Sequence, residues 1–160
     1  MVGKVAQLQA LLHEYRAETG LSEVNMRDMV DYAVAHGMSL PKPIDPRDRL
    51  AREFSDAARQ EVRFDGKTGR PYRANHAITE MRNGAQLTFW IDIDQAPRTR
   101  MQKSLIQRRE QIVGDAVQLS LDLDHWNSVN ALEEPIAIIL DFEFDVQLRK
   151  LGSSEMDKAS

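Results

Sequence analysis

The sequence predicts an α+β protein in which helices precede an antiparallel β-meander and a long helix follows it. Apolar residues recur at helical spacing before residue 60, alternate like a strand up to residue 94, and return to helical spacing after residue 96. A strong hairpin signal, Asn83-Gly84, lies within the alternating region. At 160 residues the chain fits one domain, or a small domain with an extension.

Three helices are expected before the strands. The first runs from about Val2 to Glu18 and ends at Gly20, because glycine suits the left-handed conformation of a helix C-cap. The second begins after Asn25, which is a good N-cap, and ends at Gly37. The third begins at Asp45-Pro46, where proline can occupy the first helical position without losing a hydrogen bond.

The strands are expected to form a three-stranded antiparallel meander. Residues 62–64 make a short strand, and a loop with two glycines leads to a second strand from Tyr72 to Met81. The Asn83-Gly84 turn then leads to a third strand over residues 85–94. The apolar residues that share one face of this last strand are Leu87, Phe89, Ile91 and Ile93.

A long helix is expected from about Ala96 to Trp126, because apolar residues recur there at three-, four- and seven-residue intervals. Residues 135–144 are rich in isoleucine and predict a C-terminal strand. The acidic residues and proline at 133–135 also suit a helix start, so a helix is the alternative there. Residues 152–160 are small or polar and are expected to be disordered.

The outline of the N-terminal part is that of a winged helix-turn-helix, in which two capped helices are followed by a glycine-rich basic hairpin that serves as a wing. The features that carry it are Met29-Val30 after a capped start, Ala33, Gly37-Met38, and Asp45-Pro46 followed by Leu50 and Phe54. In these features residues 24–64 resemble winged-helix domains of the HARE type, which occur in DNA-linked proteins. The resemblance covers about residues 5–80.

The resemblance implies that the proline-started helix packs on the preceding helix and that a hairpin forms the wing. The sequence departs from the family pattern at the end of the wing strand, in Arg73-Ala74-Asn75-His76. We therefore expect a winged-helix-like domain at residues 1–94. The long helix and C-terminal strand, residues 95–151, are expected to pack on it or on a second subunit.

Charge is distributed unevenly along the chain, although the net charge is only −4. Residues 41–110 carry 15 Lys/Arg against 10 Asp/Glu, a balance of +5. Residues 111–160 carry 3 against 10, a balance of −7. A basic middle on an acidic chain indicates a local electrostatic surface for one partner rather than a general affinity for polyanions.

Basic side chains in three places are the candidate DNA-binding residues, because the planar guanidinium donor fork suits phosphates and guanine edges. They are Arg47, Arg49 and Arg52 on the third helix, Arg63, Lys67, Arg70 and Arg73 around the hairpin, and Arg98, Arg100 and Lys103 at the start of the long helix. Acidic residues lie between the arginines of the third helix. One alternative is therefore that these arginines form an ordinary solvent-exposed helix face that binds no partner. Contact with an acidic protein surface, including the acidic half of a second copy, is another.

Composition and motifs exclude several kinds of site and several classes of protein. The chain has no cysteine, which excludes disulfides and thiolate zinc sites. No apolar stretch approaches the roughly 20 residues that span a bilayer, and the N-terminus does not resemble a signal peptide, so we expect a cytoplasmic protein. Asp122 and Asp124 point about 200° apart on a helix. They cannot chelate together, so we expect neither metal nor cofactor.

The leading prediction is a non-enzymatic DNA-binding protein, either a regulator or an accessory DNA-binding subunit. A homodimer is expected, because one small domain can hardly cover the stripe made by Leu105, Ile112, Leu119 and Trp126. The alternative is an assembly module whose winged helix does not bind nucleic acid. An enzyme acting on nucleic acid is a third class, but the scattered histidines show no nucleophile-and-base pattern.

Overall fold

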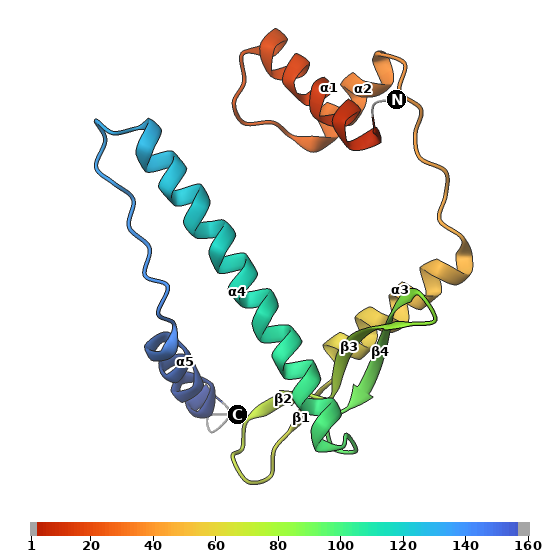
Figure 1. Cartoon of the computed structure of the whole chain (residues 1–160), viewed down its shortest axis with the longest axis vertical. Helices are drawn as coiled ribbons and strands as arrows, with labels where there is room; N and C mark the ends of the chain where they lie inside the picture. Colours follow the sequence, from red (N-terminus) through yellow and green to blue (C-terminus); the bar gives the residue numbers. More distant parts are fainter. Residues whose placement is uncertain (1–2, 157–160) are drawn as a thin grey trace. The chain divides into compact units, whose positions relative to one another are not determined.

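The computed structural model describes the backbone of residues 3–156 and the side chains of residues 3–152. Within this part the chain is a mixed α+β protein with five helices and two small antiparallel hairpins (Figure 1). It divides into two compact units, residues 1–46 and 47–160. The first two helices belong to the first unit, whereas all the strands and the long helix belong to the second.

The first unit contains α1 (Lys4–Thr19) and α2 (Met26–Ala35), as the sequence predicts. Gly20 ends α1 with φ at 70°, and its N–H donates to the Arg16 carbonyl. The Asn25 side chain caps α2 by accepting a hydrogen bond of 2.9 Å from the backbone N–H of Arg27. Gly37, at φ 88°, ends α2. The predicted cap and both predicted stops are confirmed.

Helix α3 (Pro46–Gln60) starts at the predicted proline, and from Arg47 onward it belongs to the second unit. Two hairpins follow it. β1 (Val62–Phe64) pairs with β2 (Pro71–Arg73), and β3 (Asn75–Arg82) pairs with β4 (Ala85–Asp92).

The expected three-stranded meander is wrong in one respect, because the middle strand changes partner at Ala74. This residue is fully buried, its N–H donates to the Glu61 carbonyl, and its carbonyl accepts from the N–H of Ile93. One residue thus joins the end of the first hairpin to the start of the second, and the chain forms two two-stranded sheets in place of one.

The Asn83-Gly84 turn is confirmed. Both residues have positive φ, 51° and 78°, and Arg82 lies opposite Ala85 across the turn. This turn fixes the register of β3 and β4, which places Thr79 opposite Thr88 and Ala77 opposite Trp90. Ile93, expected on the apolar face of the last strand, follows the final residue of β4.

The long helix α4 (Arg98–Val129) confirms the prediction from heptad-like spacing. Its first half lies against β3 (Figure 1). The Gln107 side chain accepts a bond of 3.0 Å from the Thr79 N–H and donates one of 2.6 Å to the Thr79 carbonyl. The Ser104 hydroxyl, almost fully buried, donates to the Ala77 carbonyl at 2.6 Å. Side chains of α4 thus occupy the position that a third strand would take beside β3.

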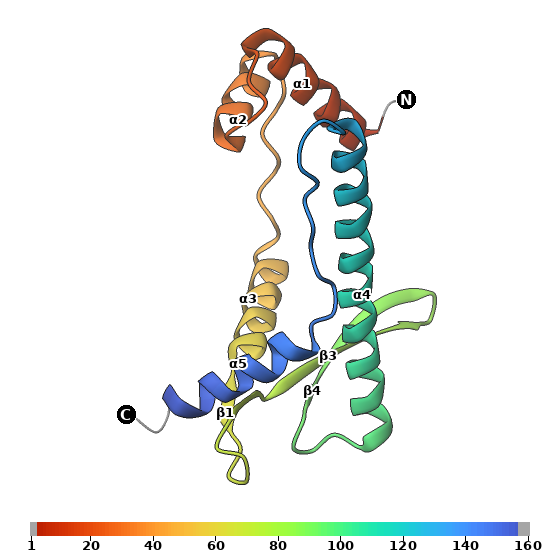
Figure 2. The same ribbon diagram turned by 90° about the vertical axis from the view of Figure 1, so that its left-hand side faces the viewer.

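The predicted strand at 135–144 is wrong. Residues 134–142 are extended without regular pairing, and the final helix α5 (Glu143–Met156) begins after them, later than the alternative helix start at 133–135. Glu143 and Asp145 lie in the first turn of α5, where carboxylates favour a helix, and the Asp141 carboxylate accepts from the Glu143 N–H. Figure 2 shows the extended segment between α4 and α5.

The expected disordered tail also differs in part, because α5 continues through Gly152 to Met156. Residues 157–160 of that predicted tail lie outside the described residues. None of the described helices is long and apolar enough to span a bilayer.

Candidate nucleic-acid interface

A polar pocket of about 230 Å³ lies in the second unit, where one face of the β3–β4 hairpin meets α4 and the end of α3. Of the described residues that line it, three are arginines and none is acidic. The lining residues are Arg59, Arg73, Asn75, His76, Ala77, Thr79, Trp90, Ser104, Gln107, Arg108 and Gln111. We call this the cationic pocket.

The three arginines of the cationic pocket come from three different elements. Arg59, on the last turn of α3, places its guanidinium carbon 5.5 Å from the centre of the Trp90 ring and pairs with Asp56 at 2.6 Å. Arg73 and Arg108 are exposed and form no ion pair within the described residues. A guanidinium held on an aromatic face keeps N–H donors at its edge, so the pocket can hydrogen-bond an anion.

His76 forms part of the inner wall of the cationic pocket and is only 8% exposed. Its ring Nε2 lies 3.0 Å from the Arg73 carbonyl oxygen. Because a carbonyl only accepts, Nε2 carries the hydrogen and Nδ1 is the acceptor in the neutral ring.

Arg63, predicted to bind DNA, instead lies among three carboxylates within the chain. Its guanidinium contacts Asp94 at 2.8 Å, Asp92 at 2.9 Å and Glu61 at 3.3 Å. Hydrogen bonding to Asp92, then to Asp94, raises the pKa of Arg63 further above its already high value. The same contact lowers the pKa of Asp92. This cluster ties β1 to the end of β4.

Arg100 and Lys103, also predicted to bind DNA, contact Glu80 on β3. Each has a nitrogen 2.9 Å from the Glu80 carboxylate, and Arg82 approaches the same group at 2.7 Å. Hydrogen bonds from Arg100, Lys103 and Arg82, in that order of importance, hold the pKa of Glu80 far below its usual range. The basic start of α4 is therefore matched by a carboxylate of the sheet on which it packs.

The predicted residues on α3 are exposed along the helix. Arg49 pairs with Glu53 one turn later at 3.3 Å, an exposed pair of the kind that contributes little to stability. Arg52 forms no ion pair with any residue that the structure describes. Arg47 stands next to the first residue of the helix.

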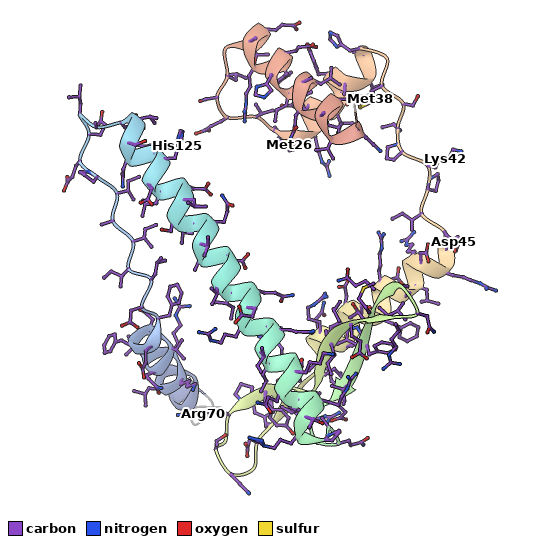
Figure 3. The ribbon with its side chains drawn as sticks, in the orientation of Figure 1. Met26, Met38, Lys42, Asp45, Arg70 and His125 are labelled. Atoms are coloured by element: carbon purple, nitrogen blue, oxygen red, sulfur yellow. The ribbon has the colours of Figure 1, made fainter. Side chains whose placement is uncertain are left out.

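Lys67 and Arg70 lie on the loop between β1 and β2, and Figure 3 labels Arg70 there. Asp65 organises this loop, because its carboxylate accepts from the Lys67 N–H at 2.7 Å and its own N–H donates to the Arg70 carbonyl. Gly69 supplies the positive φ of 68° that the loop needs. Arg98 starts α4 and borders a shallow depression over Met101 and Leu105.

The predicted dimerisation residues on α4 are all solvent-accessible in the single chain. Leu105 and Ile112 are about half exposed, and Leu119 and Trp126 are each 39% exposed. A second cavity, of about 490 Å³, lies between α1 and α2 in the first unit and is almost wholly apolar. Its lining includes Met26 and Met38, which Figure 3 labels in that unit.

The sequence does not predict the cationic pocket, although the basic stretches on α3 and α4 both contribute residues to it. Arg59 and Arg108 are 49 positions apart, and only the fold brings them to one cavity. Gln107, Arg108 and Gln111 share one side of α4 at three- and four-residue spacing. That polar strip on an otherwise amphipathic helix is the one signal that could have indicated a lined cavity.

Comparison with known proteins gives no relative for this chain. No family model matches the sequence, and neither the curated proteins nor the solved structures yield a match. Function must therefore be inferred from the site alone. Among the described residues there is no group of three or more side chains placed to hold a metal ion.

Proposed function

We propose that this chain is a non-enzymatic DNA-binding protein, acting as a regulator or as an accessory DNA-binding subunit. The observation that carries the proposal is the cationic pocket, in which Arg59, Arg73 and Arg108 surround a cavity without an acidic lining residue. Backbone phosphates are the anions that such a surface would bind on duplex DNA, and they supply most of the affinity of non-specific binding.

In this proposal α3 and the β1–β2 hairpin act as the recognition helix and the wing of a winged helix-turn-helix. Arg47, Arg49 and Arg52 would contact base edges or phosphates from α3, and Lys67 and Arg70 would contact the backbone or minor groove from the wing. Arg98 would add a phosphate contact from the start of α4.

Three of the residues that the sequence predicts as DNA-binding form ion pairs within the fold. Arg63, Arg100 and Lys103 are matched by carboxylates of the same chain, so the proposal assigns them to holding the sheet and α4 together. The DNA contacts are accordingly expected from Arg73 and Arg108 in the cationic pocket, together with the side chains on α3 and the wing.

The test is a titration of a random-sequence duplex of about 30 base pairs, followed by fluorescence anisotropy at several salt concentrations. With about five or six phosphate contacts, log K should fall with log salt at a slope of about −4 to −5. The double variant Arg73→Gln, Arg108→Gln should bind more weakly and reduce the slope by about 2. No binding at low salt would overturn the proposal.

A matched control removes two charges elsewhere. Arg16→Gln with Arg27→Gln changes the net charge equally, but these residues lie on α1 and α2 and do not line the cationic pocket. This control should leave the slope within about 0.5 of the unaltered chain, because only contacted phosphates release counterions. Equal losses in both double variants would indicate a diffuse charge effect and would contradict the pocket's role.

The second candidate function is an assembly module, and the apolar surface of both units favours it. The groove between α1 and α2 and the stripe of Leu105, Ile112, Leu119 and Trp126 on α4 are both accessible in the single chain. We propose that the chain is a homodimer in either case. Antiparallel α4 helices would bring the basic start of one beside the acidic end of the other. A chain that self-associates but binds no duplex would favour this second candidate.

A further inference from the structure

The segment that follows α4 has the form of a strand without a sheet. Residues 134–142 are extended, and their side chains alternate. Ile136, Ile138, Leu140 and Phe142 share one face and are 39–46% exposed, whereas Ile139 on the opposite face is 80% exposed. From Ala137 to Asp141, the backbone makes no hydrogen bond to any part of the chain that the structure describes.

One side chain fixes the start of this segment. The amide of Asn127 accepts from the Ile136 N–H and donates to the Ile136 carbonyl, each at 2.9 Å. The backbone groups of Ile136 therefore face α4. Since these groups alternate in direction along an extended chain, those of Ala137, Ile139 and Asp141 face away from α4 and form an open edge.

The sheet offers a second open edge, on β4. Gln107 binds the backbone of Thr79, so the backbone groups of Thr79 point away from β4. In an antiparallel pair, a residue opposite a position whose backbone groups point away from the partner strand also points its own groups away from that strand, toward the opposite edge of the hairpin. Thr88 and Trp90 thus direct unpaired N–H and C=O groups to the free edge of β4, within the described residues.

The segment is too short to pair with β4 of its own chain. Asn127 lies twenty residues beyond Gln107 on α4, which is about 30 Å along a helix. From Ile136 to Phe142 the extended chain spans only about 20 Å. While Asn127 holds Ile136, the segment can at most approach the near end of its own hairpin. It cannot lie along β4.

We propose that the segment 136–142 adds as a strand to the free edge of β4 in a second copy of this chain, and that the exchange is reciprocal. Antiparallel α4 helices would bring the end of one helix, where the segment starts, beside the hairpin of the other. The acidic segment, with Asp141 inside it and Glu133, Glu134 and Glu143 beside it, would then meet an edge where Arg59 lies over the Trp90 ring. The acceptor strand bears Trp90 of the cationic pocket. The proposal rests on the homodimer and is independent of DNA binding.

Proline substitutions test the two edges separately, by sedimentation velocity over a concentration series without nucleic acid. The unaltered chain should reach twice its mass of 18.3 kDa at tens of micromolar. Thr88→Pro and Ile139→Pro each remove an N–H that the exchange uses, and each should raise the dimer dissociation constant at least tenfold. Ile138→Pro is the matched control, because its N–H faces α4. It should change the constant less than twofold.

Mixing distinguishes exchange between copies from other effects of proline. Thr88→Pro chains keep an intact segment and Ile139→Pro chains keep an intact β4 edge, so the mixture should form a heterodimer more tightly than either variant forms a homodimer. A monomeric unaltered chain would overturn the proposal. Equal weakening by Ile138→Pro and Ile139→Pro would also overturn it.

The absence of cysteine from the sequence allows the occupant to be identified directly. Chains with Thr88→Cys are mixed with chains in which one of positions 137 to 141 is changed to cysteine, and the mixture is then oxidised. The proposal requires a disulfide between the two kinds of chain for at least one position. Disulfides formed only between two segment cysteines would show that the segment pairs with itself, which would contradict the assignment to β4.

Discussion

The two edges of the β3–β4 hairpin differ in how their backbone groups are satisfied. On the β3 edge, Gln107 and Ser104 of α4 bind the Thr79 and Ala77 backbone, so side chains complete the sheet. On the β4 edge, Thr88 and Trp90 have no such partner within the described residues. An edge closed by side chains needs no further strand, whereas an open edge is available to another chain. The β4 edge is therefore the edge of this hairpin to which a further strand could be added.

The largest expected effect comes from proline at two opposite residues. Thr79 and Thr88 face each other across the hairpin, and their hydroxyls lie 3.1 Å apart, so either substitution removes the same side-chain contact. Thr79→Pro also removes the N–H that donates to Gln107 and should destabilise the fold by about 3 kcal/mol. Thr88→Pro should cost about 1 kcal/mol or less, because proline is tolerated on an edge strand.

Urea unfolding at a concentration where the chain is monomeric would measure both variants. Similar losses of unfolding free energy in the two variants would mean that the β3 edge is not closed by α4. The contrast between the edges would then disappear.

The next effect concerns the side chain that closes the β3 edge. Gln107→Ala leaves the Thr79 N–H and carbonyl without their partner, and we expect a loss of about 2 kcal/mol in unfolding free energy. Gln118→Ala is the control, since within the described residues that exposed side chain binds Asp122 on the same helix and no other residue. It should change stability by less than about 0.5 kcal/mol. Equal effects of the two variants on urea unfolding would contradict the role given to Gln107.

The Asn83-Gly84 turn sets the register of β3 and β4, and so fixes which backbone groups point to each edge of the hairpin. Gly84 has φ at 78°, and apart from its chain neighbours no atom lies within 4 Å of the place that a Cβ would take, so the strain of Gly84→Val would come from the backbone alone. We expect a loss of about 1–3 kcal/mol and a melting temperature lower by roughly 2–4 °C per kcal/mol. Gly114→Val, in helical backbone with equal space, should be neutral or slightly stabilising. An unchanged melting temperature for Gly84→Val would mean that the turn does not hold the register.

The smallest expected effect is a pH dependence at the closed edge. Glu80 has a lowered pKa in the folded chain, so its contribution to stability is full above its ordinary pKa of about 4.5 and is lost as the pH falls below that value. Glu80→Gln should therefore lower the melting temperature at pH 7, and the difference should shrink as the pH falls from about 5 toward 2. Glu110→Gln, at an exposed carboxylate whose one ion pair in the described part of the chain is with its neighbour Arg109, should show no such trend.

The sequence predicted the elements whose signals are local. Caps at Asn25 and Asp45-Pro46, stops at Gly20 and Gly37, and the Asn83-Gly84 turn each depend on a few adjacent residues, and the structure has helix ends or a turn at each. The long helix was predicted equally well because its apolar spacing extends over many turns. These signals reflect backbone preferences of neighbouring residues, which do not depend on contacts with the rest of the chain.

Long-range features were not predictable in the same way. The isoleucine-rich segment has strand-like alternation, but a strand requires a neighbour, and the described chain places none beside it. The charge pattern did not reveal that Arg63 and Arg100 are matched by Asp92 and Glu80, because those partners are 29 and 20 positions away. The arginines of the cationic pocket likewise come from three separate elements, so only the fold shows that they line one cavity.

In the exchange proposed above, the amide of Asn127 would determine whether the segment pairs with its own chain or with another. It can bind both groups of Ile136 because an amide both donates and accepts, whereas a carboxylate at that position could only accept. Release of this contact would lengthen the free chain to about 40 Å, from Val129 to Phe142, enough to reach its own hairpin. An intramolecular strand competes at an effective concentration in the millimolar range. Asn127→Asp would thus favour a self-closed monomer over exchange between copies.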